Sequence, residues 1–286
     1  MGCVTFGREI DRDISFEIMD HALERGINLF DTAAAYGGGA SERVLGEWMA
    51  DRGTRDQVVL ASKVNGRLVR DHVTSSAEES LQRLRTDRID LFQLHNWDGE
   101  TPLEETLAAL SSLVEQGKVR AIGCSNWTAD QLNEALAVSE KENFARMESV
   151  QPPYNLVQRE IESSLLPLCR DEKIATICYS PLAAGFLTGK YQRDQEIPKG
   201  TRFEVIPGHQ AIYFTEHGFA VLDRLETAAR ESGLSMVQLA LAWVLRRPDV
   251  TSVLIGARHA EHLDQALRAA ETDPGTNLFT EIFQPS

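Results

Sequence analysis

Several features of exported, membrane-bound and nucleic-acid-binding proteins are missing from this sequence. No apolar run approaches the roughly 18 residues that a membrane-spanning helix needs, and the start, MGCVTFGREIDRD, has neither a basic segment nor a long apolar stretch. Lys and Arg number 29 against 43 Asp and Glu, which gives a formal net charge of -14. We therefore expect neither a membrane nor a nucleic acid as a partner, whereas a small anionic ligand requires only a few local cations.

Cysteine is scarce, and its spacing indicates no cross-linked framework. The four cysteines, Cys3, Cys124, Cys169 and Cys178, lie in or beside apolar segments, and none forms a CxxC pair. This placement favours buried free thiols over disulfides or a zinc site. A reducing, cytoplasmic compartment is the corresponding expectation.

A Rossmann nucleotide-binding motif is also missing. No Gly-x-Gly-x-x-Gly follows an early strand, and the triplet Gly37–Gly39 has the wrong spacing. The sequence instead alternates stretches of helical period with short apolar runs that are typical of buried strands. These runs are residues 1–6, 27–31, 57–63, 89–95, 119–125, 149–152, 174–179 and 252–256. Eight strands alternating with helices predict a closed (β/α)8 TIM barrel, and we expect residues 1–286 to form this single domain.

Capping residues place some of the helix starts. The combinations are Thr101, Pro102 and Glu104 at N-cap, N1 and N3, Thr128 with Gln131, and Ser235 with Gln238. One long region, residues 180–217, interrupts the alternation because it is rich in Gly and Pro and too polar for a core helix. Long loops in compact domains are usually functional, and this one is expected on the active-site face of the barrel.

Four polar residues stand at or just beyond the ends of three consecutive expected strands. Asp31 ends one strand, Tyr36 follows it, and Lys63 and His95 end the next two. A barrel directs these ends to one mouth. An ammonium lowers the pKa of a nearby phenol, and a carboxylate keeps the ammonium charged, so Lys63 is expected to act on Tyr36 and Asp31 on Lys63. With His95 orienting a carbonyl oxygen, the set suits protonation of an oxygen while another group delivers hydride.

Each of these residues also has a structural interpretation. A single Lys or Asp at a strand end is most often part of a structural ion pair, and a Tyr in a Gly-rich turn is most often packed with a hydrated hydroxyl. The joint placement at neighbouring strand ends favours the catalytic interpretation. His95 alone also suits a metal ligand, but no second ligand stands at a suitable spacing, so we expect no metal site.

Seven motifs follow one another between residues 2 and 267. They are FDTAAAYGGGASERVLG, ASK ending at Lys63, DLFQLH ending at His95, IGCSN ending at Asn126, VQPPYN, YSPLAAGFLTGKY and SVLIGAR. In this order they resemble the aldo-keto reductase family. The resemblance implies a (β/α)8 barrel and hydride transfer from NADPH to an aldehyde or ketone without a metal. It makes Asp31, Tyr36, Lys63 and His95 a catalytic tetrad, with Tyr36 as the general acid in reduction.

The resemblance also implies a cofactor site for NADPH/NADP+, covered by the loop of residues 180–217. Matches to the nicotinamide contacts are Ser125, Asn126, Gln151 and the stacking ring of Tyr179. Matches to the pyrophosphate loop are Ser180, Leu182, Gly185, Leu187 and Lys190, and matches to the 2′-phosphate site are Gly256, Ala257 and Arg258. Without the resemblance, Ser125, Asn126 and Gln151 also suit strand-end capping, Tyr179 suits the core, and Lys190 suits a solvated loop.

The chain departs from the family pattern in three places. Where the family commonly has Gln, then an acidic residue followed by Asn for adenine contacts, this chain has His262, Gln265 and Ala266, of which only the first two retain hydrogen-bonding side chains. The family's N-terminal β-hairpin is missing, so the barrel floor is expected to be partly open, unless Met1 is a mis-set start. The tail, TDPGTNLFTEIFQPS, does not clearly resemble the family's terminal segment.

These observations predict an NADP(H)-dependent reductase of a small carbonyl substrate. Tyr36 and His95 would contact the substrate, and Trp97, Trp127 and Phe6 would form the wall of its site, although Trp127 also suits packing at a helix start. One alternative is a cofactor-binding but non-catalytic or sensory barrel, like the channel-associated β subunits that share this fold. The other is an N-terminally truncated, inactive reductase. The intact tetrad favours catalysis.

Overall fold

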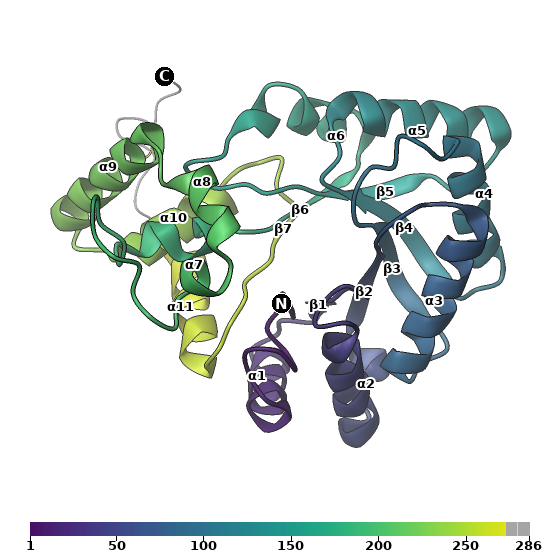
Figure 1. Ribbon diagram of the computed structural model, residues 1–286, viewed down its shortest axis with the longest axis horizontal. Coiled ribbons are helices and arrows are strands. Elements are labelled where there is room, and N and C mark those ends of the chain that lie inside the picture. Colours follow the sequence, from purple (N-terminus) through teal and green to yellow (C-terminus); the bar gives the residue numbers. More distant parts are fainter. Residues whose placement is uncertain (273–278, 280–286) are drawn as a thin grey trace.

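A computed structural model describes residues 1–272 and residue 279 of the chain. In this part, seven parallel strands lie side by side in the order of the sequence and curl into a barrel with helices on the outside (Figure 1). The strands are β1 Leu29–Asp31, β2 Val59–Val64, β3 Ile89–Leu94, β4 Val119–Ser125, β5 Met147–Gln151, β6 Ala175–Cys178 and β7 Ser252–Val253. The predicted barrel of parallel strands is confirmed, and the ends of these strands lie within two residues of the predicted ones, except that β7 ends three residues early.

Residues 1–6 do not form the eighth strand that the sequence predicts. Gly2 alone of these residues pairs with the barrel, in parallel with Asp31 on one side and with Gly256 on the other, whereas Phe6 pairs only with the nearby Ile10. Its N–H donates to the carbonyl of Ile255 at 2.9 Å, and the N–H of Cys3 donates to the carbonyl of Asp31 at 2.8 Å. The backbone then turns at residues 4–9. A single residue therefore occupies the position of the eighth strand and links β1 to the segment that follows β7.

Helices follow most strands and cover the outside of the barrel (Figure 1). The longer ones are α1 Arg12–Glu24, α2 Ala40–Arg52, α3 Arg70–Leu84, α4 Leu103–Glu115, α5 Ala129–Glu142, α6 Leu165–Glu172, α9 Glu216–Ser232, α10 Met236–Leu245 and α11 Ala260–Glu271. The 3-10 helices η1 Arg55–Gln57 and η2 Glu160–Glu162 lie between them.

Two of the three predicted helix starts are confirmed. Complete capping boxes begin α5, with Thr128 and Gln131, and α10, with Ser235 and Gln238. The prediction for α4 is wrong by one residue, because its N-cap is Pro102. The hydroxyl of Thr101 instead donates to the carboxylate of Asp98 at 2.6 Å.

Residues 180–217 do not form one irregular loop, because apolar side chains organise most of the segment. It contains the short helices η3 Ala183–Thr188, α7 Arg202–Val205, η4 Pro207–His209 and α8 Gln210–Tyr213, and α9 begins before it ends. Aromatic residues spaced irregularly along the segment pack against one another, with the rings of Tyr191 and Phe203 at 4.8 Å and those of Phe186 and Tyr213 at 6.2 Å. Their irregular spacing hides this small core from a periodicity analysis.

The cysteines behave as the sequence predicts, since Cys3, Cys124, Cys169 and Cys178 are all buried and free. Within the described residues, no helix combines the length and the apolarity that crossing a bilayer would require. The tail discussed above lies outside the described residues, apart from Thr272 and Phe279.

Candidate active site

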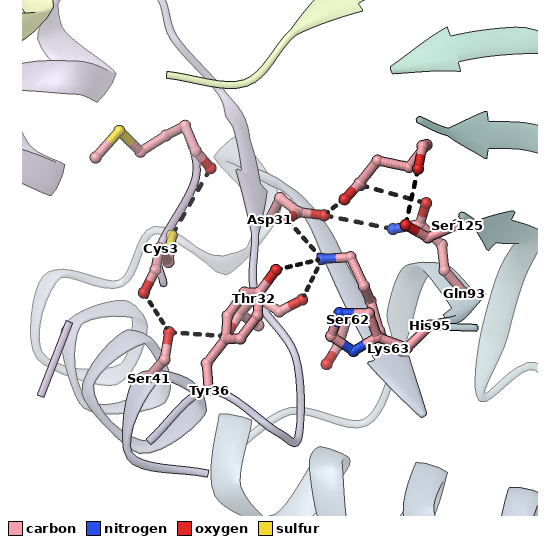
Figure 2. A network of polar contacts seen from close by, with 12 residues as sticks. Cys3, Asp31, Thr32, Tyr36, Ser41, Ser62, Lys63, Gln93, His95 and Ser125 are labelled. Atoms are coloured by element: carbon pink, nitrogen blue, oxygen red, sulfur yellow. Dashed lines mark hydrogen bonds and ion pairs between the residues drawn. The ribbon is translucent and has the colours of Figure 1, made fainter. Parts of the chain in front are cut away.

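The four residues of the predicted tetrad meet at the mouth of the barrel (Figure 2). Asp31 ends β1, Tyr36 lies in the turn before α2, Lys63 lies in β2, and His95 directly follows β3. The Lys63 ammonium donates to the Asp31 carboxylate at 2.6 Å, to the Thr32 carbonyl at 2.9 Å and to the Tyr36 hydroxyl at 3.3 Å. The rings of Tyr36 and His95 lie edge to face with centroids 5.8 Å apart. A fully buried ammonium thus joins a carboxylate to a phenol.

Glycines and a buried ion pair fix the turn that carries Tyr36. Gly39, the N-cap of α2, has φ of 82°, a conformation that L side chains rarely adopt. In the first turn of α2, the fully buried Glu42 accepts hydrogen bonds from Ser62 and, at 2.6 Å, from Arg83. Because Ser62 precedes Lys63 in β2, this contact holds the Tyr36 turn and the lysine strand together.

Burial and charge set the protonation of Lys63 and Tyr36. Burial lowers the pKa of Lys63, but the Asp31 carboxylate and Tyr36 outweigh it, so the pKa is raised above its ordinary value. Burial raises the pKa of Tyr36, and the opposing effect of Lys63 does not compensate. Lys63 therefore lowers the pKa of Tyr36, as the sequence predicts, but burial raises this pKa by more. At neutral pH the site holds an ammonium beside a neutral phenol.

His95 is a neutral imidazole with free hydrogen-bonding capacity. Burial, reinforced by Lys63, lowers the pKa of His95 to about 4. Its Nδ1 is buried and contacts no hydrogen-bond partner among the described residues. An imidazole with an unpaired ring nitrogen, in the same cavity lining as Tyr36, suits a ligand oxygen that would complete its hydrogen bonding.

Two glutamines complete the hydrogen bonding of Asp31, and only Gln151 was named as a site residue from the sequence. Oδ1 of Asp31 accepts from Nε2 of Gln151 at 2.8 Å and from Nε2 of Gln93 at 3.3 Å. Figure 2 shows Gln93 beside Asp31. Because a carboxylate only accepts, both side-chain amides must present their NH2 groups to Asp31. The side-chain oxygen Oε1 of Gln151 is therefore left to accept from a ligand. Gln93 was missed, although a buried polar residue two positions before His95 on an apolar strand was a usable signal.

A cavity of about 630 Å³ opens above the tetrad. Its lining includes Asp31, Tyr36 and His95, with Lys63 beneath them. The predicted cofactor residues that line it are Ser125, Asn126, Gln151, Tyr179, Ser180, Leu182, Gly185, Lys190, Gly256, Ala257, Arg258, His262 and Gln265. Leu187 does not line it, because its side chain is fully buried in the small core of this segment.

The structure does not bring the predicted wall residues to the cavity. Trp97 and Trp127 pack edge to face, with centroids 4.7 Å apart, and Trp127 is buried. Phe6 is fully buried in the core. None of the three lines the cavity. The aromatic type of these residues suits a wall position, but the sequence does not show the packing partners that bury them elsewhere.

Three residues of the cavity wall adopt the left-handed conformation without being glycine. Asn126 has φ of 61°, Ser180 has φ of 53° and Ala184 has φ of 56°. Such a conformation costs about 1–3 kcal/mol and persists only where the surroundings hold it. Asn126 is held on both ends of its amide, by the Tyr179 hydroxyl at 2.8 Å and by the His95 carbonyl at 3.0 Å. This chain of contacts fixes the wall between β3, β4 and β6.

Basic groups gather at the other end of the cavity. Lys190, Arg202, His209, Arg258 and His262 all line it, and the sequence did not single out Arg202 or His209. Arg202 pairs with Glu9 at 3.1 Å, whereas no carboxylate of the described residues pairs with Lys190 or Arg258. Burial and Arg258 lower the pKa of Lys190. Unpaired cations that crowd one another in an acidic chain fit an anionic ligand.

A glycine keeps this basic end open. A Cβ at Gly185 would lie 3.3 Å from Nζ of Lys190, and the φ of 92° also excludes most other residues. The side-chain oxygen of Gln151, the unpaired His95 nitrogen, and Lys190 and Arg258, two cations without a carboxylate partner in the described part of the chain, together fit a ligand with an amide at one end and phosphates at the other. A nicotinamide nucleotide has this chemistry. The described residues contain no cluster of three or more His, Cys, Asp or Glu that would suit a metal ion.

Comparison with known proteins assigns the chain to one family. The chain matches the aldo/keto reductase family over residues 1–279. It is 38% identical to the aldo-keto reductase YhdN of Bacillus subtilis, over 89% of this chain and 78% of the relative. It is 31% identical to the aldo-keto reductase yakc [NADP(+)] of Schizosaccharomyces pombe, over 93% of this chain and 80% of that protein. It is also 30% identical to a probable voltage-gated potassium channel subunit beta of Arabidopsis thaliana, over 95% of this chain and 86% of that protein.

Proposed function

Because the chain belongs to the aldo/keto reductase family, we propose that it is an NADP(H)-dependent oxidoreductase that reduces an aldehyde or ketone to an alcohol. The observation that carries this proposal is the buried ammonium of Lys63, which joins Asp31 to the Tyr36 phenol at the floor of a cavity whose other end is basic. The bound nucleotide would supply the hydride.

The chain's own residues would then manage the substrate oxygen. The neutral His95 and the Tyr36 hydroxyl both face the cavity, so a carbonyl oxygen placed between them accepts two hydrogen bonds. As negative charge develops on that oxygen, Tyr36 transfers its proton and becomes a phenolate. The Lys63 ammonium, 3.3 Å from the phenol oxygen, stabilises this phenolate, and Asp31 keeps the ammonium protonated.

The proposed cofactor contacts follow from the free groups. The side-chain oxygen of Gln151 would accept from the carboxamide of the nicotinamide, which Ser125 and Asn126 would also contact. The ring of Tyr179 would lie against the nicotinamide ring. Lys190 and the segment of Ser180, Leu182 and Gly185 would hold the pyrophosphate, and Gly256, Ala257 and Arg258 the 2′-phosphate. His262 and Gln265 would lie beside the adenosine end. Residues 180–217 would cover the bound nucleotide.

A non-catalytic role is the weaker proposal. One relative is named a channel subunit, but the hydrogen-bonded Asp31, Lys63 and Tyr36, with the His95 ring beside Tyr36, support catalysis in this chain. We further propose a cytoplasmic location, since four buried free thiols suit a reducing compartment.

The proposal is tested by titration and turnover. The purified protein is titrated with NADPH and with NADH while quenching of its tryptophan fluorescence is followed, and NADPH oxidation is then measured with a panel of aldehydes and ketones. We expect tighter binding of NADPH and turnover of at least one carbonyl compound. Binding of neither nucleotide would contradict the proposal.

A further inference from the structure

The basic end of the cavity contains a histidine whose hydrogen bond is of an unusual kind. His262 lies in the first turn of α11, and its Nδ1 accepts from the backbone N–H of Arg258 at 3.3 Å. An imidazole that accepts on one nitrogen carries its single proton on the other, so this contact exists only while His262 is neutral. A second proton would have to enter at Nδ1 and would break the contact.

The charges around His262 also keep it neutral. Burial, then the neighbouring His259, lowers the pKa of His262, and Lys190 and Arg258 act in the same direction. Glu261 acts in the opposite direction but does not compensate. Arg202 and His209 line the same cavity. The packed helix α10, MVQLALAWVL, contributes no ionisable group, and α1 directs His21 and Arg25 toward Asp264 rather than toward this site.

A phosphate bound here would remove both the hydrogen bond and the electrostatic repulsion that keep His262 neutral. One of its oxygens can replace Nδ1 as the acceptor for the Arg258 N–H, which frees that nitrogen for a proton. The charged imidazole can then donate to another phosphate oxygen, and the negative charge offsets the surrounding cations. Ligand binding and protonation of His262 are therefore coupled through one shared hydrogen-bond donor.

We propose that His262 binds the 2′-phosphate of NADPH as an imidazolium, so that binding takes up a proton and the preference for NADPH over NADH depends on pH. This inference rests on the proposed function, because it assumes that NADPH occupies the cavity. It assigns His262 a role that a glutamine at the same position would not perform, since an amide does not titrate.

The direction of the pH effect follows from linkage. Below the pKa of the free protein, the imidazole is charged with or without ligand, and the preference for NADPH is at its maximum. Above the pKa of the complex it is neutral in both states, and the preference is at its minimum. A shift of one unit between the two states corresponds to about tenfold in affinity. At about pH 6.5 and above, most of the phosphate itself is in its dianionic form, because its second pKa is about 6.

The test compares dissociation constants at about pH 6.5 and about pH 8.5. Tryptophan quenching gives the values for NADPH and NADH, and titration calorimetry in two buffers of different ionisation enthalpy gives the protons taken up. For the unmodified protein we expect the NADPH/NADH affinity ratio to fall about tenfold over this range, with proton uptake at the lower pH. His262→Gln retains a hydrogen-bonding side chain and should abolish both effects. His259→Gln, at the exposed N-cap of α11, is the matched control. This variant should keep most of the pH dependence of the affinity ratio and most of the proton uptake.

The outcomes separate the two proposals. If NADPH binds but the affinity ratio is independent of pH, or if His262→Gln retains the proton uptake, the inference about His262 is wrong and the reductase proposal stands. If the affinities of NADPH and NADH fall equally with pH, the 2′-phosphate is not the partner and the inference is likewise overturned. If the unmodified protein binds neither nucleotide, the proposed function itself fails.

Discussion

At the scale of the residue, the Tyr36 hydroxyl is the group on which the proposed reaction depends. Tyr36→Phe removes only this hydroxyl and leaves the Lys63–Asp31 pair, so we expect carbonyl reduction to fall by about 10²–10⁴-fold, the range typical of a lost general acid. The dissociation constant for NADPH should change little, because the hydroxyl is not among the proposed nucleotide contacts. Steady-state kinetics and the fluorescence titration measure the two quantities. Unchanged turnover would remove Tyr36 from the proton-transfer step.

The raised pKa of Tyr36 makes a second prediction, on pH dependence. A proton donor works only while protonated, so activity is lost as the pH rises through its pKa. Burial places the pKa of Tyr36 above its ordinary value of 10.0, and the pKa of His95 is about 4. We therefore expect kcat for reduction, at saturating nucleotide, to stay level across the neutral range. A decline centred near neutral pH would show that another group donates the proton.

Residues at strand ends were predictable, and residues that depend on tertiary contacts were not. Asp31, Lys63 and His95 end predicted strands, and the fold alone brings them together. Arg202 reaches the cavity only because the aromatic core of residues 180–217 positions α7, and nothing near Arg202 in the sequence indicates this. The same limit explains the wall residues, since the mutual packing of Trp97 and Trp127 is a contact between two loops.

At the scale of the element, α2 is tied to its neighbours by one buried carboxylate. Glu42 is fully buried and pairs with Arg83, whose side chain is 20% exposed. We expect Glu42→Ala to lower the free energy of unfolding by at least about 2 kcal/mol, because it leaves the buried Ser62 hydroxyl and Nε of the partly buried Arg83 without their acceptor. Glu79→Ala removes the other carboxylate that pairs with this arginine, but Glu79 is 63% exposed, so its loss should stay within about 0.5 kcal/mol. Equal losses in chemical denaturation would contradict this assignment.

Elements with a regular period were predictable from the sequence, whereas short or irregular ones were not. The strands from β1 to β7 alternate with amphipathic helices, and capping boxes mark the starts of α5 and α10. Residues 1–6 contain strand-forming side chains, but their backbone turns after Gly2, where the carbonyl of Thr5 accepts from the N–H groups of Arg8 and Glu9. These local hydrogen bonds form in place of strand pairing, so the segment does not continue as a strand.

At the scale of the whole molecule, closure of the barrel depends on very little backbone. The segment after β7 and the end of β1 are joined through Gly2 and the residues beside it, and α1 and α11 add the pairing of His21 with Asp264 at 3.0 Å. Gly2, Asp31 and Gly256 also line the cavity. The closure of the fold and the wall of the proposed cofactor site are therefore the same structure, so a weakened closure should reduce both stability and nucleotide binding.

Two substitutions at one position test this coupling. Gly2→Pro removes the N–H that donates to Ile255 at 2.9 Å, and we expect it to lower the free energy of unfolding by about 1–3 kcal/mol and to weaken NADPH binding. Gly2→Ala retains the N–H, and its Cβ would meet no atom closer than 3.7 Å, so stability should stay within about 0.5 kcal/mol. Chemical denaturation and the fluorescence titration measure the two effects. If Gly2→Pro lost stability but bound NADPH normally, closure would be independent of the site, because the cavity wall would then keep its shape without this hydrogen bond.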